Sequence, residues 1–283
     1  MGTMTVARPQ TLEQRLERLQ ADLAALPGLV VAYSGGADSA FLLAAAVRAL
    51  GAERVLAATA VSDSLPQSER GPAADLAASL GVATWTPQTH EIEREGYRAN
   101  AGDRCYFCRS EMFEVFAPEA ERRGWPVATG TNADDVVAGF RPGIRAARER
   151  GARTPLADAG LTKTEIRDVS ARWGLPTWDK PAAACLASRI AYGIEVTPAR
   201  LARVEQAEGR VRALLPQLRD LRVRDLGGRG RIELDRPTLD CLDAGDEARI
   251  RAAVEACGLG PVEFRAFRSG SMNDLLADPD RYR

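Results

Sequence analysis

Residues 29–39 constrain the fold of this 283-residue chain more than any other stretch. The apolar run 29–33 has the composition of a buried strand in a parallel sheet. A Ser-Gly-Gly turn follows at Ser34, and the pattern over 38–50 predicts an amphipathic helix. Paired glycines let backbone N–H groups face an anion, and the helix dipole adds partial positive charge at the same point. The stretch therefore predicts a phosphate-binding loop at the carboxyl end of a strand.

This loop differs from two commoner phosphate loops. The sequence has neither G-x-x-x-x-G-K-[ST] nor G-x-G-x-x-G after the strand, so it lacks the lysine of a Walker-type NTPase. Its pattern, S-G-G-x-D-S, resembles the PP-loop of the ATP pyrophosphatases. In that family the loop holds pyrophosphate as a leaving group while AMP is transferred to a carbonyl oxygen. We expect Asp38 to hold Mg²⁺ on the phosphates. The residues expected to bind ATP here are Ser34, Gly35, Gly36, Asp38 and Ser39.

Strands and helices alternate along the first two-thirds of the chain. Further strands are predicted over 54–61, 82–86 and 125–129, and further helices over 12–26, 67–80, 111–123 and 162–173. This alternation predicts an α/β fold with a parallel sheet. Later segments predict helices over 201–214 and 246–256, antiparallel strands over 221–226 and 231–235, and a strand over 262–267. We therefore expect a PP-loop ATP pyrophosphatase domain over residues 1–194 and a smaller α+β domain over 195–283.

Composition excludes several classes of protein. The 38 basic residues nearly balance 39 acidic ones, for a formal charge of −1, which argues against a dedicated nucleic-acid binder. No run of about 18 apolar residues predicts a membrane span, and residues 1–10 lack the apolar segment of a secretory signal. We therefore expect a cytoplasmic protein. In that compartment, five cysteines point to metal binding or catalysis before disulfides.

Three of the cysteines stand where chemistry is expected. Cys105 and Cys108 form a C-x-x-C pair, which could bind a metal ion or an iron–sulfur cluster. A redox pair, half of a zinc site or a chance spacing would give the same pattern. Cys185 lies in a segment with two prolines and a tryptophan that reads as a loop, and Arg189 beside it favours the thiolate. The remaining two cysteines fall in predicted helical parts and are expected to be buried thiols; they are Cys241 and Cys257.

A second motif follows the strand predicted over 125–129. Gly130-Thr-Asn132 precedes two acidic residues and resembles the second ATP-facing motif of PP-loop enzymes. Asn132 would then contact nucleotide, and Asp134 or Asp135 would hold metal. A helix N-cap followed by an acidic first turn explains the same residues equally well. Further along, Thr162-Lys-Thr-Glu165 predicts a capping box whose lysine is also in reach of a phosphate.

Taken together, six motifs resemble the LarE family of pyridinium-3,5-biscarboxylic acid mononucleotide sulfurtransferases. They are the phosphate loop, Arg104-Cys-Tyr-Phe-Cys108, Gly130-Thr-Asn132, Arg141-Pro-Gly143, Thr162-Lys-Thr-Glu-Ile-Arg167 and Cys185-Leu-Ala-Ser-Arg189. The resemblance covers nearly the whole chain. It implies an enzyme that adenylylates a pyridinium carboxylate with ATP, releases pyrophosphate and replaces the AMP with sulfur. The product serves the synthesis of the nickel-pincer nucleotide cofactor.

The resemblance also implies a substrate site. Arg222 and Arg224 are alternate residues on one predicted strand face, and their guanidinium groups suit a substrate phosphate through bidentate contacts. Ser188 and Arg189 join them as expected substrate-binding residues. The smaller domain is then the substrate-binding and oligomerisation domain, and the family implies a homo-oligomer.

Two sulfur sources occur in the family. One type has only the cysteine that corresponds to Cys185 and gives up its sulfur, leaving dehydroalanine. The other type has three cysteines that hold a [4Fe–4S] cluster, with one iron open to an extra sulfide. Because Cys105 and Cys108 accompany Cys185 here, we expect the cluster type, with Cys185 also acting in catalysis and with sulfide from an unidentified source.

Two alternatives stay open at this point. A tRNA thiolase of the same fold class can also pair a PP-loop with a C-x-x-C motif and a distant cysteine. The balanced charge and the missing terminal zinc pairs argue against it. A non-catalytic zinc- or nucleotide-binding regulator is the alternative from a different class. Metal content and substrate-dependent pyrophosphate release would separate it from an enzyme.

Overall fold

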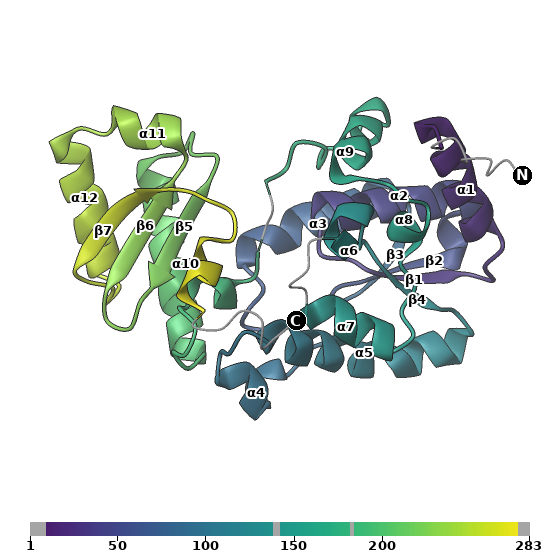
Figure 1. Cartoon of the computed structure of the whole chain (residues 1–283), viewed down its shortest axis with the longest axis horizontal. Coiled ribbons are helices and arrows are strands. Elements are labelled where there is room, and N and C mark those ends of the chain that lie inside the picture. Colours follow the sequence, from purple (N-terminus) through teal and green to yellow (C-terminus); the bar gives the residue numbers. More distant parts are fainter. Residues whose placement is uncertain (1–9, 138–141, 182–183, 277–283) are drawn as a thin grey trace, which may run out of the picture.

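The computed structural model describes residues 10–137, 142–181 and 184–276, which form two separate sheets (Figure 1). The larger sheet is parallel, with strand order β3-β2-β1-β4; its strands are β1 (Leu29–Ala32), β2 (Val55–Ala58), β3 (Ala83–Trp85) and β4 (Val127–Thr129). In the smaller sheet, β6 pairs antiparallel with β5 and parallel with β7; its strands are β5 (Leu221–Asp225), β6 (Gly230–Leu234) and β7 (Val262–Ala266). The predicted α/β class with a second, smaller α+β part is confirmed.

Helices cover both faces of the larger sheet, because successive residues of β1 point to opposite sides. Leu29 and Val31 face a core built with α1, α2, α3, α8 and α9, whereas Val30 and Ala32 face α5 and α7 (Figure 1). The helices are α1 (Leu12–Ala24), α2 (Ala37–Leu50), α3 (Gln67–Ser79), α5 (Arg104–Arg123), α7 (Pro142–Glu149), α8 (Pro155–Asp158) and α9 (Lys163–Arg172). A strand that is apolar throughout is what burial on both faces requires.

The parallel register brings the site-bearing segments to one edge of this sheet. Ala32, the last residue of β1, pairs with Ala58 of β2 and with Thr129 of β4. The phosphate loop, the segment after β2 and Gly130 therefore all leave the sheet at the carboxyl ends of neighbouring strands. Ligands of open parallel sheets bind at this edge.

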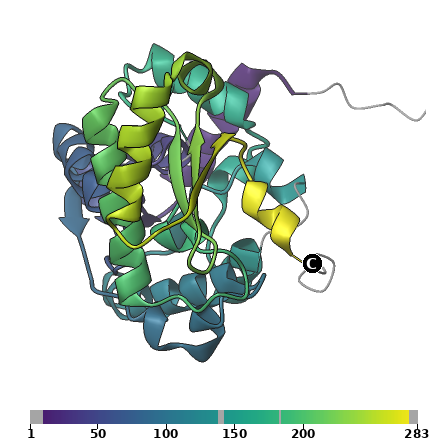
Figure 2. The same ribbon diagram turned by 90° about the vertical axis from the view of Figure 1, so that its left-hand side faces the viewer.

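The smaller sheet has one apolar face and one polar face. Its apolar face, which includes Val223 and Ile232, packs on α10 (Pro198–Leu214) and α12 (Ala244–Glu255). The polar face carries Arg222, Arg224 and Glu233. The C-terminal 3-10 turn η4 (Ser271–Leu275) lies on that side, away from the helices (Figure 2), and Ser271 Oγ donates to Glu233 Oε1 at 2.9 Å. Alternation along β5 therefore buries charged groups under the C-terminal segment.

The remaining elements are short and connect these layers. They are η1 (Ala52–Arg54), η2 (Glu91–Glu93), α4 (Glu95–Arg98), α6 (Ala133–Val137), η3 (Leu186–Arg189) and α11 (Arg236–Cys241). The capping box predicted at the start of α9 is confirmed, with the Thr162 and Glu165 side chains capping each other's backbone. Two expectations were wrong. The helix predicted from 111 begins at Arg104, and Cys241 is exposed rather than buried.

The two sheet-containing parts are joined by hydrogen bonds outside the covalent connection. The backbone N–H of Gln67, at the start of α3, donates to Glu205 Oε1 of α10 at 2.6 Å. Pro66, at the N-cap position of α3, has no polar side-chain group that could cap the helix. Glu205, from the other part of the chain, provides the cap instead. The division at residues 194 and 195 stays a prediction. Among the described residues, no helix has both the length and the apolarity to cross a membrane.

Candidate active site

The phosphate loop is shaped by glycine at its first turn. Gly35 has φ of +69°, and a Cβ built on it would lie 2.7 Å from the Cβ of Ala73 in α3. Both the backbone angle and the space therefore require glycine there. The two loop hydroxyls meet, with Ser34 Oγ 3.2 Å from Ser39 Oγ, and Ser39 Oγ donates to the Gly36 carbonyl at 3.1 Å. Helix α2 starts directly afterwards, so its N-terminal N–H groups open onto the loop.

The segment after β4 packs directly on this loop. A Cβ at Gly130 would lie 2.8 Å from the backbone nitrogen of Ser39, so the two backbones touch. This contact sets the Gly-Thr-Asn motif beside the first turn of α2. The two motifs therefore lie next to each other at the same edge of the sheet.

Asp38 lies partly buried among charged groups that come from two other elements, α6 and α9. Burial raises the pKa of its carboxyl group, Lys163 and Arg167 lower it, Asp135 raises it further, and the net direction is upward. Lys163 Nζ also lies 3.0 Å from Asp135 Oδ1. Asp38 and Asp135 therefore both lie in the neighbourhood of the Lys163 ammonium group, and a role for them in holding Mg²⁺ stays a prediction.

Asn132 caps the start of α6 and also lies near Asp38 of the phosphate loop. Its Oδ1 accepts from the backbone N–H of Asp135 at 3.0 Å, as a helix cap does. Its side chain also lowers the pKa of Asp38, so the amide faces that carboxylate. The residue is 0% exposed, so its amide is buried beside the phosphate loop. Its contact with nucleotide stays a prediction.

A lysine that the sequence reasoning missed also reaches the loop. Lys180 Nζ donates to the Gly35 carbonyl at 2.9 Å and to Glu69 Oε2 at 2.6 Å. Lys180 and Gly35 are 145 positions apart in the sequence, so no local pattern relates them. Arg141, in the predicted Arg-Pro-Gly motif, lies outside the described residues.

The three cysteines expected to hold a cluster come from two elements. Cys105 and Cys108 occupy the start of α5, and Cys185 precedes η3. Burial raises the pKa of Cys108 well above its ordinary value, and Glu91, Cys185 and Cys105 raise it further. The thiols are therefore close enough to interact electrostatically. Within residues 10–137, 142–181 and 184–276, however, they do not form a group that could hold a metal ion.

Two buried side chains interact electrostatically with these cysteines, and sequence reasoning assigned neither. The hydroxyl group of Tyr97 bonds Ser64 Oγ. Burial, together with the charges of Cys185 and Cys108, raises its pKa. Arg104 donates to Asn100 Oδ1 and, at 2.9 Å, to the carbonyl of Ala187. For Arg104 burial lowers the pKa, but Cys105 and Cys185 raise it more, so the net direction is upward. Of the two, only Arg104 had a sequence signal, since it opens the Arg-Cys-Tyr-Phe-Cys motif.

Ser188 and Arg189 hold the backbone around Cys185. The Cys185 carbonyl accepts from Ser188 Oγ at 2.7 Å and from Arg189 Nη1 at 3.1 Å. Arg189 is fixed in turn by Glu208, whose Oε1 lies 2.9 Å from its Nε. These side chains lock the position of Cys185 through its main chain.

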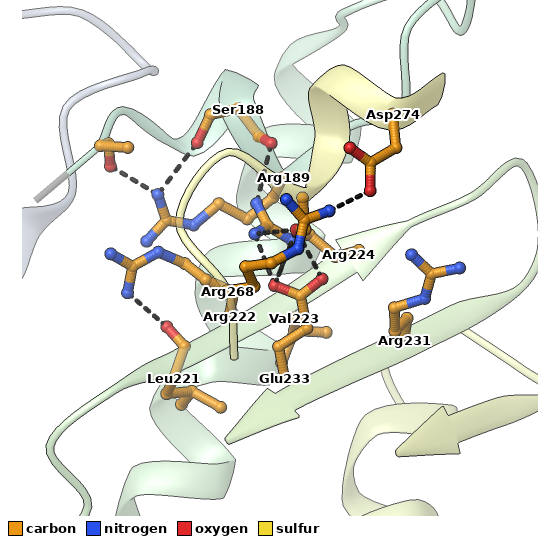
Figure 3. A network of polar contacts seen from close by, with 12 residues as sticks. Ser188, Arg189, Leu221, Arg222, Val223, Arg224, Arg231, Glu233, Arg268 and Asp274 are labelled. Carbon is orange, nitrogen blue, oxygen red and sulfur yellow. Dashed lines mark hydrogen bonds and ion pairs between the residues drawn. The ribbon is translucent and has the colours of Figure 1, made fainter. Parts of the chain in front are cut away.

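Arg222 and Arg224 lie beside them on the polar face of β5, but their surroundings differ (Figure 3). Arg224 Nη2 pairs with Glu233 Oε2 at 2.6 Å, and its Nη1 donates to the Ser188 carbonyl at 3.1 Å. Burial and then the charge of Arg189 lower the pKa of Arg222 to about 10. The charge of Arg224 is thus offset by Glu233. Around Arg222 the cations Arg189 and Arg224 lower the pKa, whereas the carboxylates of Glu208 and Asp220 raise it.

Comparison with individual known proteins places the chain in a family, although no protein-family profile matches it. A protein of Lactiplantibacillus plantarum named pyridinium-3,5-bisthiocarboxylic acid mononucleotide synthase is 30% identical over 269 residues, which are 94% of this chain and 96% of that protein. The chain belongs to the LarE family.

Two further relatives have no assigned activity. An uncharacterised protein of Synechocystis is 43% identical over 224 residues, 79% of this chain and 82% of that protein. An uncharacterised protein of Methanocaldococcus jannaschii is 30% identical over 137 residues, which cover 48% of this chain and 52% of its own. LarE membership confirms the resemblance that the motifs indicated. The roles of individual residues stay predictions.

Proposed function

We propose that this chain is an ATP-dependent sulfurtransferase that turns a carboxylate of a pyridinium mononucleotide into a thiocarboxylate. The family relative named as a pyridinium-3,5-bisthiocarboxylic acid mononucleotide synthase supports the substrate and the product. The observation that carries the proposal is the pairing of a phosphate loop around Asp38 with a group of arginines around Cys185. One site suits ATP, and the other suits the phosphate of a mononucleotide.

The first half of the reaction would take place at the phosphate loop. A substrate carboxylate oxygen attacks the α-phosphorus of ATP, the bond to the bridging oxygen breaks, and pyrophosphate leaves with that electron pair. Backbone N–H groups at Gly35, Gly36 and the start of α2 would hold the leaving group. Asp38, with Asp135 nearby, would hold Mg²⁺, which neutralises charge on the departing phosphates.

The second half needs a sulfur nucleophile at the acyl carbon. The acyl–AMP bond breaks as sulfur adds, and AMP leaves with the electron pair of the carbon–oxygen bond. Arg222, with Arg189 and Arg224 nearby, would hold the substrate phosphate through charged hydrogen bonds. Because Arg189 also fixes the Cys185 carbonyl, substrate and thiol would be placed by the same group of side chains.

We further propose that Cys105, Cys108 and Cys185 are the ligands of a [4Fe–4S] cluster that carries the transferable sulfide. Three thiolates in one neighbourhood suit a cluster with one iron open to an exogenous ligand. In the described residues the three side chains do not converge as metal ligands do, so cluster binding would have to draw them together. Protein reconstituted anaerobically with iron and sulfide should absorb across the visible range and turn over repeatedly.

The alternative sulfur source is Cys185 itself, supported by the bonds from Ser188 and Arg189 that fix its backbone. Its thiolate would form a thioester with the acyl group, and loss of the Cα proton would break the Cβ–Sγ bond to leave dehydroalanine. Cys108→Ala separates the two sources. The cluster predicts loss of colour and of repeated turnover. The sacrificial route predicts one turnover per chain, loss of the elements of H₂S from Cys185, and an active variant.

The test of the proposed function is product formation from ATP and pyridinium-3,5-biscarboxylic acid mononucleotide. Equal amounts of pyrophosphate and AMP should form with substrate, and mass spectrometry should show oxygen replaced by sulfur. Pyrophosphate release with tRNA, but not with the mononucleotide, would instead favour the tRNA thiolase. We also propose a homo-oligomer, which light scattering on the purified protein would test.

A further inference from the structure

Lysine is rare in this chain, and both lysines lie beside the phosphate loop. Of the 38 basic residues only Lys163 and Lys180 are lysines, so arginine makes nearly all the other ion pairs. Lys163 acts on Asp38, the fourth residue of the loop after Ser34. Lys180 contacts the loop itself, through the Gly35 carbonyl. A chain that otherwise uses guanidinium groups therefore places its two compact, flexible ammonium groups at one site.

The backbone of Lys180 is held while its ammonium group faces the loop. Arg167 Nη2 donates to the Lys180 carbonyl at 2.8 Å, which ties this residue to α9. Its Nζ lies 2.6 Å from Glu69 Oε2, and the Lys180 side chain is 21% exposed. The ammonium group therefore stands in a defined position that an entering anion can still reach.

The chemistry of an ammonium group fits a phosphate at this point. It has three N–H donors, so it can contact Gly35 and Glu69 and still donate to an anion in the loop. Walker-type loops carry their phosphate-binding lysine within the loop motif, and this loop lacks one. Here a lysine reaches the loop from 145 residues further along the chain.

We infer that Lys180 is a phosphate-binding residue that contacts the β- and γ-phosphates of ATP and then the pyrophosphate that leaves. Glu69 is a positioning residue that keeps the ammonium group at the loop and competes with the anion for it. This inference rests on the proposed function, because it presumes that the loop binds ATP. The competing interpretation is that Lys180 only ties its segment to α3 through Glu69.

Titration with magnesium pyrophosphate tests the inference without any turnover. Calorimetry on the full chain should show that Lys180→Met weakens magnesium pyrophosphate binding about tenfold or more, the loss expected for one charged hydrogen bond. AMP binding by the same variant should stay within about twofold, since AMP has no β- or γ-phosphate. Arg18→Met, which removes a basic residue paired with Asp22 on α1, is the matched control and should bind both ligands as wild type does.

Glu69→Gln separates phosphate binding from a structural tie. If Glu69 competes for the ammonium group, this variant should bind magnesium pyrophosphate more tightly than wild type. That gain should disappear in the Lys180→Met background. A structural tie predicts instead that both single variants lose pyrophosphate and AMP binding together, with lower melting temperatures.

The outcomes separate this inference from the proposed function. If wild-type protein and Lys180→Met bind magnesium pyrophosphate equally well, the role of Lys180 is overturned. The sulfurtransferase proposal would still stand. Wild-type protein that binds neither ATP nor pyrophosphate would overturn the proposed function itself. Weaker pyrophosphate binding with intact AMP binding supports the inference.

Discussion

The phosphate loop and the arginine group around Cys185 achieve anion binding in different ways. The loop is built from backbone: a positive φ at Gly35, a close approach at Gly130 and the open end of α2. The arginine group is built from side chains, in which Glu208 and Glu233 fix Arg189 and Arg224. All parts of the loop lie within a few residues or at one sheet edge. The arginine group collects its parts from four separate segments.

This difference predicts how each site fails. A backbone site tolerates changes of side chain but not of conformation, because its N–H donors are present in every residue except proline. A side-chain site depends on particular ion pairs, and removing one partner leaves a buried charge without compensation. Removal of an arginine or its partner should therefore mainly affect the arginine group. Addition of a Cβ to a glycine should mainly affect the phosphate loop.

The largest effect is expected where the backbone site depends on one side chain. Asp38→Asn should lower substrate-dependent pyrophosphate release at least about a thousandfold, because loss of Mg²⁺ costs several kcal/mol of transition-state stabilisation. A coupled pyrophosphate assay at saturating substrate measures this, with Asp75→Asn on the exposed side of α3 as control. Undiminished release by Asp38→Asn would remove Asp38 from the reaction.

Arg224→Ala should mainly destabilise the fold. Glu233, 1% exposed, would lose its paired cation, at a cost of about 3–5 kcal/mol in the free energy of unfolding. Urea denaturation followed by circular dichroism measures the loss. Replacing both partners, as in Arg224→Met with Glu233→Leu, should recover much of it. A cost below about 1 kcal/mol would show that the pair contributes little.

Arg222→Ala should act on binding instead. Loss of one charged contact should weaken binding of the substrate mononucleotide by about 1.5–3 kcal/mol and leave ATP affinity unchanged. Calorimetric titration of each ligand into the variant gives both values. Equal losses for the two ligands would place Arg222 outside the substrate site and undo the contrast with the phosphate loop.

The two loop glycines form a matched pair with the smallest expected effect. Gly35→Ala adds a Cβ at φ of +69° and 2.7 Å from Ala73, so it should cost about 1–3 kcal/mol of stability. At Gly36 the φ is −81° and the nearest atom to a new Cβ is 3.5 Å away, so Gly36→Ala should cost less than about 0.5 kcal/mol. Thermal unfolding of both variants decides this, and equal melting temperatures would contradict the backbone argument.

The parts of the site that are encoded locally could be predicted from the sequence. The apolar run before Ser34, the glycine turn and the helix after it gave the loop, and period-2 alternation put Arg222 and Arg224 on one strand face. The capping box at Thr162 was equally local. These patterns report short-range geometry, which a few adjacent residues determine.

The parts that depend on long-range contacts could not be predicted. Lys180 meets Gly35 across 145 residues, and the pairing of Arg224 with Glu233 requires the register between β5 and β6. The early start of α5 was hidden because its first turns carry cysteine, tyrosine and phenylalanine, which favour helices only weakly. Whether three cysteines converge depends on the folded chain and cannot be read from their spacing.

The cap that Glu205 places on α3 has a consequence for how such proteins can be recombined. The exposed backbone N–H of Gln67, at the start of α3, finds its oxygen acceptor in residue 205. A chimaera that joins this phosphate-loop half to the C-terminal half of a relative would keep both cores yet leave that N–H to solvent unless the acceptor were retained. Position 205 is therefore one to inspect before any such exchange.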